Sequence, residues 1–243
     1  MLTKEKISEV KKIDRKDWLR LTLLGLLFYT FTQGTQFIGL SLLPAVTISL
    51  LLNFSPIIVA VMGIFLLSEK PSAVQWIGAS LFIIGILIYF YPVDLSESKT
   101  LGIIVMVIGV FANAFSSVLG RGINRSGKFH PLTVTVVSMG IGSIVMLIIG
   151  IAVQGLPPLS LINIIFLLWL AVVNTAFAFT LWNLSLRTLT AMESSIINGT
   201  MLIQITFLAW IFIGEAITWK EGVGMFIAAA GAVVVQIKKK KLI

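Results

Sequence analysis

The sequence predicts an all-α, polytopic membrane protein of about eight transmembrane helices, built as an inverted-topology repeat. The chain of 243 residues is 58% hydrophobic and 12% charged, with a mean hydropathy of +1.04. A soluble domain of this length could not bury so much apolar surface, whereas lipid makes burial unnecessary. The apolar residues fall into runs long enough to span a bilayer, where only a helix satisfies its own backbone over such lengths. Residues 45–88 also recur, without a gap, 146 positions further on.

Eight apolar stretches have the length of a membrane span. They cover about 18–41, 45–67, 73–92, 101–120, 131–154, 161–186, 191–213 and 219–237. The segment before the first stretch is charged and polar, so we expect no cleavable signal peptide. Short connections with proline or charge separate several of the others, at 44, 69–71, 91–92, 127–128 and 157–158. The third and the last stretch each follow a capping-box sequence, Ser72-x-x-Gln75 and Thr218-x-x-Glu221.

The repeat relates the second and third stretches to the last two. Six positions are identical between the copies: Ala45 and Ala191, Ser49 and Ser195, Ile57 and Ile203, Glu69 and Glu215, Gly78 and Gly224, and Gly85 and Gly231. An odd number of helices separates equivalent positions, so the two copies cross the membrane in opposite directions. Inverted repeats of this kind are typical of secondary transporters, whose substrate site lies between the halves.

The basic residues predict the orientation of the chain. If the N-terminus is cytoplasmic and the chain crosses eight times, 16 of the 18 basic residues lie inside, and only Lys99 and Lys220 lie outside. We therefore expect a multi-pass protein of the cytoplasmic membrane, in contact with lipid, with both termini in the cytoplasm. The net charge of +8 lies in segments that flank apolar runs, which argues against a nucleic-acid partner.

The two copies are unequal in length. Residues 1–92 hold a basic segment and three helices of the first copy, and residues 93–243 hold five helices of the second copy and a basic tail. If the complete unit has five helices, the first copy lacks its first two. We expect an apolar groove beside helices 18–41 and 101–120 in that case, and little export by this chain alone.

Composition also limits the chemistry. The sequence has no cysteine and one histidine, which excludes disulfides and thiolate metal sites. A membrane-embedded enzyme would need paired Asp or His residues near one interface, and the sequence has none, so we expect no catalytic residues, metal or cofactor.

The sequence resembles the EamA-like members of the drug/metabolite transporter superfamily. The first copy has Pro56, then Leu67-Ser68-Glu69, Ile77-Gly78 and Ile84-Gly85, and the second has Ile213-Gly214-Glu215, Gly224 and Gly231. The resemblance covers 17–236. It implies ten helices and transport of amino acids, nucleobase-like metabolites or drugs through a cavity that opens alternately to each side. Two departures are the missing first helices and the absence of proline from helix 191–213, which we expect to be less kinked.

Polar residues within the apolar stretches are the candidate substrate path. Because polar groups in lipid are costly, several that share one helix face suggest a hydrated pocket. The candidates are Gln36, Ser49, Asn53, Asn113, Ser117, Trp182, Glu193, Thr200 and Gln204. The alternative is that they bridge helices as packing contacts. For Glu193, proton transfer competes with a capping box, Thr190-x-x-Glu193, which would hold it at a helix end.

Two function hypotheses follow. The first is a membrane transporter, an exporter of small metabolites, amino acids or drugs that works by alternating access. The alternative is a non-transporting remnant or membrane subunit that needs a partner. The small-residue face Gly224, Ala228, Gly231 and Ala232 predicts either a homodimer contact or packing within the chain.

Overall fold

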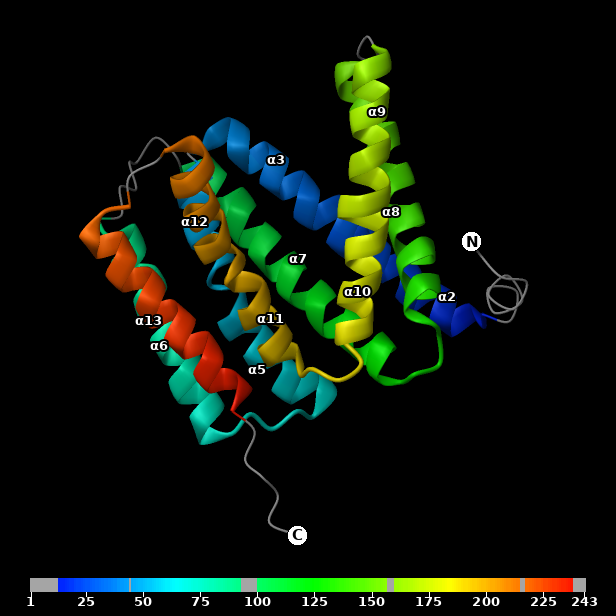
Figure 1. Ribbon diagram of the computed structural model, residues 1–243. Coiled ribbons are helices and arrows are strands. Elements are labelled where there is room, and N and C mark those ends of the chain that lie inside the picture. The colour runs from blue at the N-terminus through cyan, green and yellow to red at the C-terminus, as the bar shows by residue number, and fades with distance from the viewer. Residues whose placement is uncertain (1–12, 44, 93–99, 157–159, 215–216, 238–243) are drawn as a thin grey trace. The chain divides into compact units, whose positions relative to one another are not determined.

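The computed structural model describes residues 13–43, 45–92, 100–156, 160–214 and 217–237 (Figure 1). All regular structure in these ranges is helical, and they contain no strand. This confirms the all-α membrane fold class.

The helices of the first copy, and the helix α7 that follows it, cover residues 15–125. They are α2 (Arg15–Gly25), the π-helix η1 (Leu26–Thr32), α3 (Gln33–Leu42), α4 (Ala45–Leu52), α5 (Ser55–Leu67), α6 (Ala73–Phe90) and α7 (Thr100–Arg125). The remaining ones are α8 (Pro131–Gln154), α9 (Leu161–Trp169), the π-helix η3 (Leu170–Phe177), α10 (Ala178–Ser185), α11 (Ala191–Gly199), α12 (Met201–Ile213) and α13 (Trp219–Gln236). Each predicted stretch is thus helical, although four of them (18–41, 45–67, 161–186 and 191–213) are divided by irregular turns or π-helical segments.

Six helical stretches in the described part of the chain are long and apolar enough to cross a membrane. They are Thr47–Leu67, Ala73–Phe90, Thr100–Arg125, Pro131–Gln154, Leu161–Ser185 and Ala191–Phe212. The other two predicted spans, 18–41 and 219–237, are also helical, and their crossing of the membrane stays a prediction.

Side-chain caps explain where several helices start. Capping boxes form at Ser72–Gln75, Thr190–Glu193 and Thr218–Glu221, each with both reciprocal hydrogen bonds. Each box satisfies two backbone amides that the first turn of a helix leaves without partners. Helix α8 starts instead at Pro131, whose missing amide hydrogen costs nothing in the first turn.

The chain divides into two compact units. Unit 1 comprises residues 1–34 and 115–189, and unit 2 comprises residues 35–114 and 190–243. Two of the three boundaries fall inside helices, in α3 and in α7, and the third lies between α10 and α11. Each unit therefore contains parts of both sequence copies. The predicted division at residue 92 separates the two sequence copies and not the compact units, and it stays a prediction.

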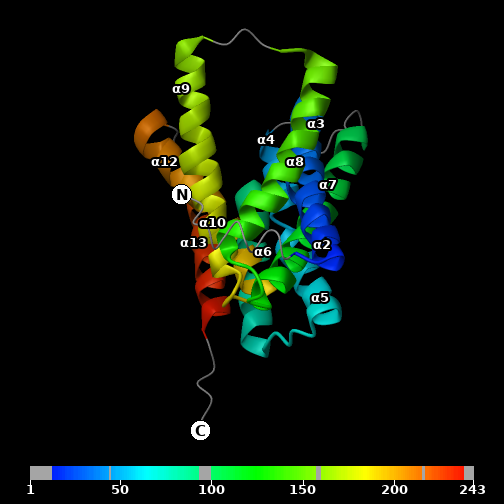
Figure 2. The ribbon, with the colours of Figure 1, turned by 90° about the vertical axis from the view of Figure 1, so that its right-hand side faces the viewer.

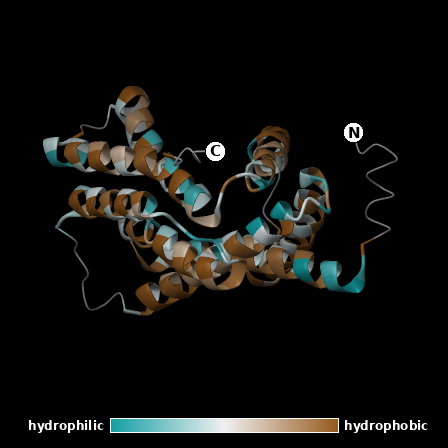
Figure 3. Cartoon of the chain, turned by 90° about the horizontal axis from the view of Figure 1, so that it is seen from below, coloured by the Kyte–Doolittle hydropathy of each residue, from teal (hydrophilic) through white to brown (hydrophobic). Residues whose placement is uncertain are grey.

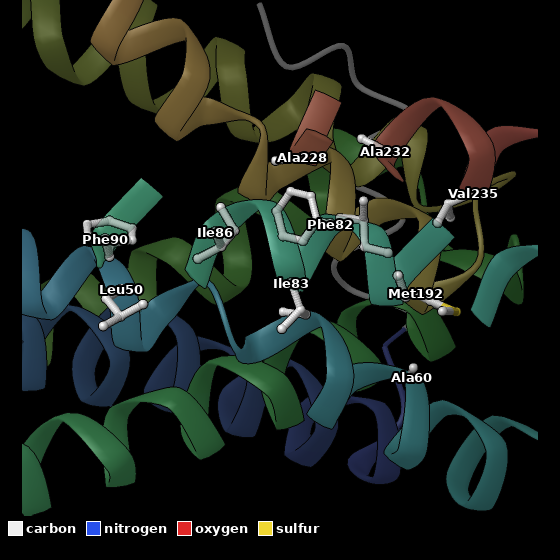
Figure 4. Packing of buried hydrophobic residues seen from close by; sticks show 12 residues of the cluster. Leu50, Ala60, Phe82, Ile83, Ile86, Phe90, Met192, Ala228, Ala232 and Val235 are labelled. Carbon is white, nitrogen blue, oxygen red and sulfur yellow. The ribbon is translucent and has the colours of Figure 1, made fainter. Parts of the chain in front are cut away.

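In unit 2, α6 and α13 lie side by side along their length (Figure 1). Phe82, Ile86 and Phe90 of α6 form one buried cluster with Ala228, Ala232 and Val235 of α13 and Met192 of α11 (Figure 4). The small-residue face of α13 is therefore covered by α6, which is the intrachain interpretation. A homodimer stays a prediction, and it would have to use a surface other than this face.

Glycines bring the backbones of α6 and α13 together. A Cβ atom on Gly78 would lie 2.8 Å from the Gly231 carbonyl oxygen, and one on Gly85 would lie 2.6 Å from that of Gly224. Any side chain at these positions would force the backbones apart. The contact is reciprocal, because Gly78 is equivalent to Gly224 in the repeat and Gly85 to Gly231.

In unit 1, α2 and η1 pack on α8. A Cβ atom on Gly25 would meet the Ser138 carbonyl oxygen, and the Thr30 hydroxyl donates to the Gly142 carbonyl at 3.0 Å. Helix α10 also contacts α8, whereas α9 diverges from it (Figure 2). No residue of α9 or η3 is buried.

Apolar side chains cover much of the exposed surface, as lipid contact requires. Figure 3 shows brown, hydrophobic residues along most helices and teal, hydrophilic ones at the start of α2. Exposed apolar residues include Phe37 on α3 and Ile108 on α7, and Phe166 and Trp169 on the segment α9. The apolar groove expected beside helices 18–41 and 101–120 stays a prediction.

Candidate functional site

Two helices of unit 2 are interrupted at equivalent positions of the repeat. Between α4 and α5 the interruption is Asn53 and Phe54, and between α11 and α12 it is Thr200. Asn53 and Phe54 are equivalent to Gly199 and Thr200 at a separation of 146 residues. Each interruption lies about 13 Å from the start of its helical stretch, which is close to the middle of a membrane span of ~30 Å.

The causes of the two interruptions differ. Pro56 has no amide hydrogen, so the Leu52 carbonyl cannot accept its usual helical bond. The Asn53 amide instead approaches the carbonyls of both Ser49 and Leu50, each at 3.1 Å. In the second copy, Gly199 has low helix propensity, and the Thr200 hydroxyl donates to the Ile197 carbonyl at 2.6 Å. Helix 191–213 is thus also interrupted, over one residue instead of two.

The two interruptions meet. A Cβ atom built on Gly199 would lie 3.3 Å from Asn53 Oδ1 and 2.6 Å from Phe82 Cζ, so glycine is the residue that fits. Asn53 is 6% exposed. Its Nδ2 donates to the Ser49 carbonyl at 2.7 Å, whereas its Oδ1 has no hydrogen-bond partner. A buried acceptor without a partner costs about 1–3 kcal/mol, which makes it a candidate ligand contact.

A second polar contact joins α7 to α5 near this place. Asn113 Nδ2 donates to the Ser55 hydroxyl at 3.2 Å, and Ser55 is buried. The structure therefore connects Ser49 with Asn53, and Asn113 with the residue that starts α5. Gln36 on α3 is half-buried and Gln204 on α12 is exposed. Neither of them takes part in the two contacts described above.

Unit 1 contains a separate small cavity of about 10 Å³, which is room for roughly one water molecule. It is lined by Leu24, Phe28, Tyr29, Ser116, Ser117, Gly120, Trp182, Asn183 and Leu186. The cavity brings together two of the predicted path residues, Ser117 and Trp182. Sequence reasoning missed Phe28 and Tyr29, because an aromatic residue in an apolar run looks the same whether it faces lipid or a cavity.

Three aromatic residues form a wall beside this cavity: Phe28 and Tyr29 line it, and Phe179 packs against both rings. Phe28, Tyr29 and Phe179 pack edge to face, with ring centroids 5.1 to 5.5 Å apart. Such arrangements are favourable for aromatic pairs and restrict ring motion. The wall contains residues of both copies, since η1 belongs to the first and α10 to the second.

A buried amide pair lies beside the same cavity. Asn124 Nδ2 donates to Asn183 Oδ1 at 2.7 Å, and Asn183 Nδ2 donates to the Thr135 hydroxyl at 3.0 Å. These bonds connect α7, α10 and α8. A connected polar network in a low-dielectric interior holds its helices in one arrangement.

Glu193 lies at the start of α11. One carboxylate oxygen accepts from the Thr190 amide at 2.8 Å, and the other accepts from Gln75 Nε2 at 3.2 Å. The neighbouring Ala191 amide donates to Glu69 Oε2 at 2.9 Å. These bonds favour the cap interpretation of Glu193 over proton transfer, and its place in the substrate path stays a prediction. Glu215, the counterpart of Glu69, lies outside the described residues.

Charged residues meet at one end of unit 1. Lys128 Nζ donates to Asp14 Oδ2 at 2.9 Å and also bonds Asp17. The hydrogen bond to Lys128 lowers the pKa of Asp14, and the bonds to Asp17 and Asp14 raise the pKa of Lys128. Asp14 also caps α2 by accepting from the Asp17 amide at 2.8 Å. The cluster ties the first helix to the connection between α7 and α8.

Sequence comparison places the chain in a known family. The model of the EamA-like transporter family matches residues 3–91 and 100–237. The chain belongs to the EamA-like transporter family. The match to the second copy is longer than the match to the first.

Individual relatives of this EamA-like protein are also described as transporters. It is 25% identical over 191 residues to the uncharacterized transporter YyaM of Bacillus subtilis strain 168, a match that spans 75% of this chain and 61% of that protein. It is 22% identical over 226 residues to an uncharacterized transporter of Archaeoglobus fulgidus, spanning 92% of this chain and 78% of the relative. One solved crystal structure shares the fold, with a TM-score of 0.76 and 16% identity over 93% of this chain and 78% of the other.

Proposed function

We propose that this protein exports small polar metabolites, such as amino acids, across the cytoplasmic membrane by alternating access. The unpaired Asn53 Oδ1, at the place where two interrupted helices meet, is the observation that carries this proposal. Interrupted helices at the interface of inverted repeats are where secondary transporters bind their substrates. An amine, amide or hydroxyl of a substrate would supply the hydrogen that Asn53 Oδ1 lacks.

The polar groups around this place are uncharged. Asn53, Ser55 and Asn113 offer amide and hydroxyl groups, and Phe82 adds an aromatic ring. Such a set of groups fits a small, neutral or zwitterionic molecule with several hydrogen-bond groups better than a multiply charged one.

Excretion by bacterial cells tests the proposal. Cells that express the chain should release more of particular amino acids or other small metabolites into the medium than cells with an empty vector, measured by mass spectrometry. Asn53→Leu should abolish most of the difference, since it removes the acceptor. Asn198→Leu, at an exposed position of α11, is the matched control and should keep it. An equal loss in both variants, or no release by the wild-type chain, would contradict the proposal.

A second function is favoured by α9. None of its residues is buried, which is the state expected of a membrane subunit that needs a partner helix. Under this hypothesis the 243-residue chain alone transports nothing in liposomes, and fusing two family-like helices ahead of Met1 restores export. Saturable transport by the purified chain would contradict the partner requirement.

A further inference from the structure

Unit 1 contains two π-helical segments at equivalent places of the two copies. They are η1 (Leu26–Thr32), in the helix that opens the first copy, and η3 (Leu170–Phe177), in the third helix of the second. A π-helical segment closes hydrogen bonds over five residues and holds one residue more than an α-helical turn. Everything beyond it is therefore rotated by about 100° relative to an uninterrupted α-helix.

One threonine side chain supports each segment in the same way. The Thr32 hydroxyl donates to the Leu27 carbonyl at 2.8 Å, and the Thr175 hydroxyl donates to the Leu170 carbonyl at 2.9 Å. Both bonds reach back five residues. Hydroxyls in ordinary helix reach back three or four residues, as Thr180 does to the Ala176 carbonyl at 2.7 Å. The two threonines thus bond the carbonyls that a π-helical turn presents.

The four residues of these bonds are related by one sequence shift. Leu27 and Thr32 become Leu170 and Thr175 when 143 positions are added. The shift differs from 146 because the connection to the next helix is longer in the second copy, with residues 186–190 where the first has 43–44. The same bond therefore occurs at the same place in helices of opposite direction.

Residues of both π-containing helices lie at the cavity of unit 1. Phe28 and Tyr29 lie inside η1 and line the cavity, as does Trp182, seven residues beyond Thr175. Phe179, four residues beyond Thr175, packs against Phe28 and Tyr29. We infer that Thr32 and Thr175 are positioning residues that hold this register and so keep Phe179 against the two rings that line the cavity. If η3 became α-helical, Phe179 would turn away from Phe28, whose ring centroid now lies 5.5 Å from its own. A role of this wall in transport rests on the proposed function, but the register itself does not.

Crosslinking measures the register directly, since the chain contains no native cysteine. The full-length Phe28→Cys/Phe179→Cys chain, in membranes, is treated with a short bifunctional thiol reagent, and the bridged fraction is measured by gel mobility. Thr175→Val should lower the equilibrium constant for the π-helical register about fivefold, the change that losing one hydrogen bond makes, and so should lower the bridged fraction. Thr175→Ser should keep it, because it keeps the hydroxyl. Thr180→Val, which loses an ordinary back-bond, is the matched control and should not change it.

A deletion separates lost register from general damage. Removing Val172 from the Thr175→Val chain takes away the extra residue, so the helix closes as α-helix with both flanks in their original orientation. Bridging should then recover, whereas removing Ile162 from α9 should not restore it. Equal loss in Thr175→Val and Thr180→Val, or no recovery on deletion of Val172, would overturn the inference. Normal crosslinking in a chain that exports nothing would contradict the proposed function alone.

Discussion

Gly199 is the residue on which the meeting of the two interrupted helices depends. We expect Gly199→Ala to destabilise the protein by about 1–3 kcal/mol, because the new methyl group overlaps Phe82 and crowds Asn53. Gly222→Ala, in α13, is the control, since nothing lies within 4 Å of a Cβ atom there. The midpoint of thermal unfolding in detergent should fall for Gly199→Ala and hold or rise for Gly222→Ala. Equal midpoints would show that the close approach is absent.

The Asp14–Lys128 pair predicts how stability depends on pH. The pKa of Asp14 is lowered from 3.8 in the folded state, so its contribution is present above pH 3.8 and is lost as the pH falls through the folded value. The pKa of Lys128 is raised from 10.5, so its contribution is lost only as the pH rises through the higher value. Between these limits the pair should stabilise the protein at a constant level.

Lys128→Met should therefore lower the unfolding midpoint between about pH 5 and 9 and have less effect near pH 3. The contribution should also shrink in high salt, because both side chains are exposed to solvent. Lys16→Met is the control on the same face. A loss that stays the same at pH 3 and in high salt would mean that packing of the lysine side chain, and not its charge, stabilises this end of the unit.

Some individual residues of the candidate site could be predicted from the sequence, and others could not. Polarity within apolar runs was sufficient to single out Asn53, Asn113 and Ser117, because few polar groups enter lipid without a structural or functional reason. Polarity was insufficient to identify Phe28 and Tyr29, because they differ from lipid-facing aromatic residues only in the direction of their side chains. That direction depends on a π-helical turn that residue spacing does not reveal.

The backbones of α6 and α13 approach each other closely at glycines. We expect Gly85→Val to lower the amount of folded protein, because its side chain would meet the Gly224 carbonyl and the backbone of Ala228. Overpacking of this kind costs about 1–3 kcal/mol. Gly140→Val in α8, where a Cβ atom meets nothing within 4 Å, is the control. Monodisperse protein recovered after detergent extraction measures the difference, and equal recovery would contradict the close packing.

Helix ends were predictable where a local rule fixes them and less so where a distant partner does. The capping boxes located the starts of α6 and α13, since both bonds of a box lie within four residues. The apolar stretch 101–120 stops before Arg121, and the helix α7 continues beyond it to Arg125. Its continuation is possible because the buried Arg121 guanidinium donates to the Leu186 carbonyl at 2.6 Å, a contact between residues 65 positions apart. No local pattern contains that information.

For the whole molecule, the distribution of charge predicts a single orientation. A reporter fused after Ile243 should be active in the cytoplasm, and one inserted near Glu97 should be external; both positions lie outside the described residues. The reason is the 16-to-2 division of basic residues between the two sides. Alkaline phosphatase and green fluorescent protein fusions distinguish the two sides. A cytoplasmic signal at Glu97 would contradict the predicted eight crossings.

The division into two units could not be predicted from the sequence. The repeat divides the chain near residue 92, whereas compactness divides it inside α3, inside α7 and between residues 189 and 190. Periodicity and repeats identify segments that share an origin, but side-by-side packing depends on side-chain shape at contacts far apart in the chain. The α6–α13 contact is an example, because its glycines look like any others in an apolar helix.

The reciprocal glycine contacts of α6 and α13 have an evolutionary consequence. Gly78 meets the Gly231 carbonyl while its counterpart Gly224 meets the Gly85 carbonyl, so exchanging the two copies leaves the contact unchanged. Two separate molecules of a one-copy ancestor, inserted in opposite orientations, would have formed this same contact before their genes fused. A protein descended from such a pair has had this joint since before it was a single chain.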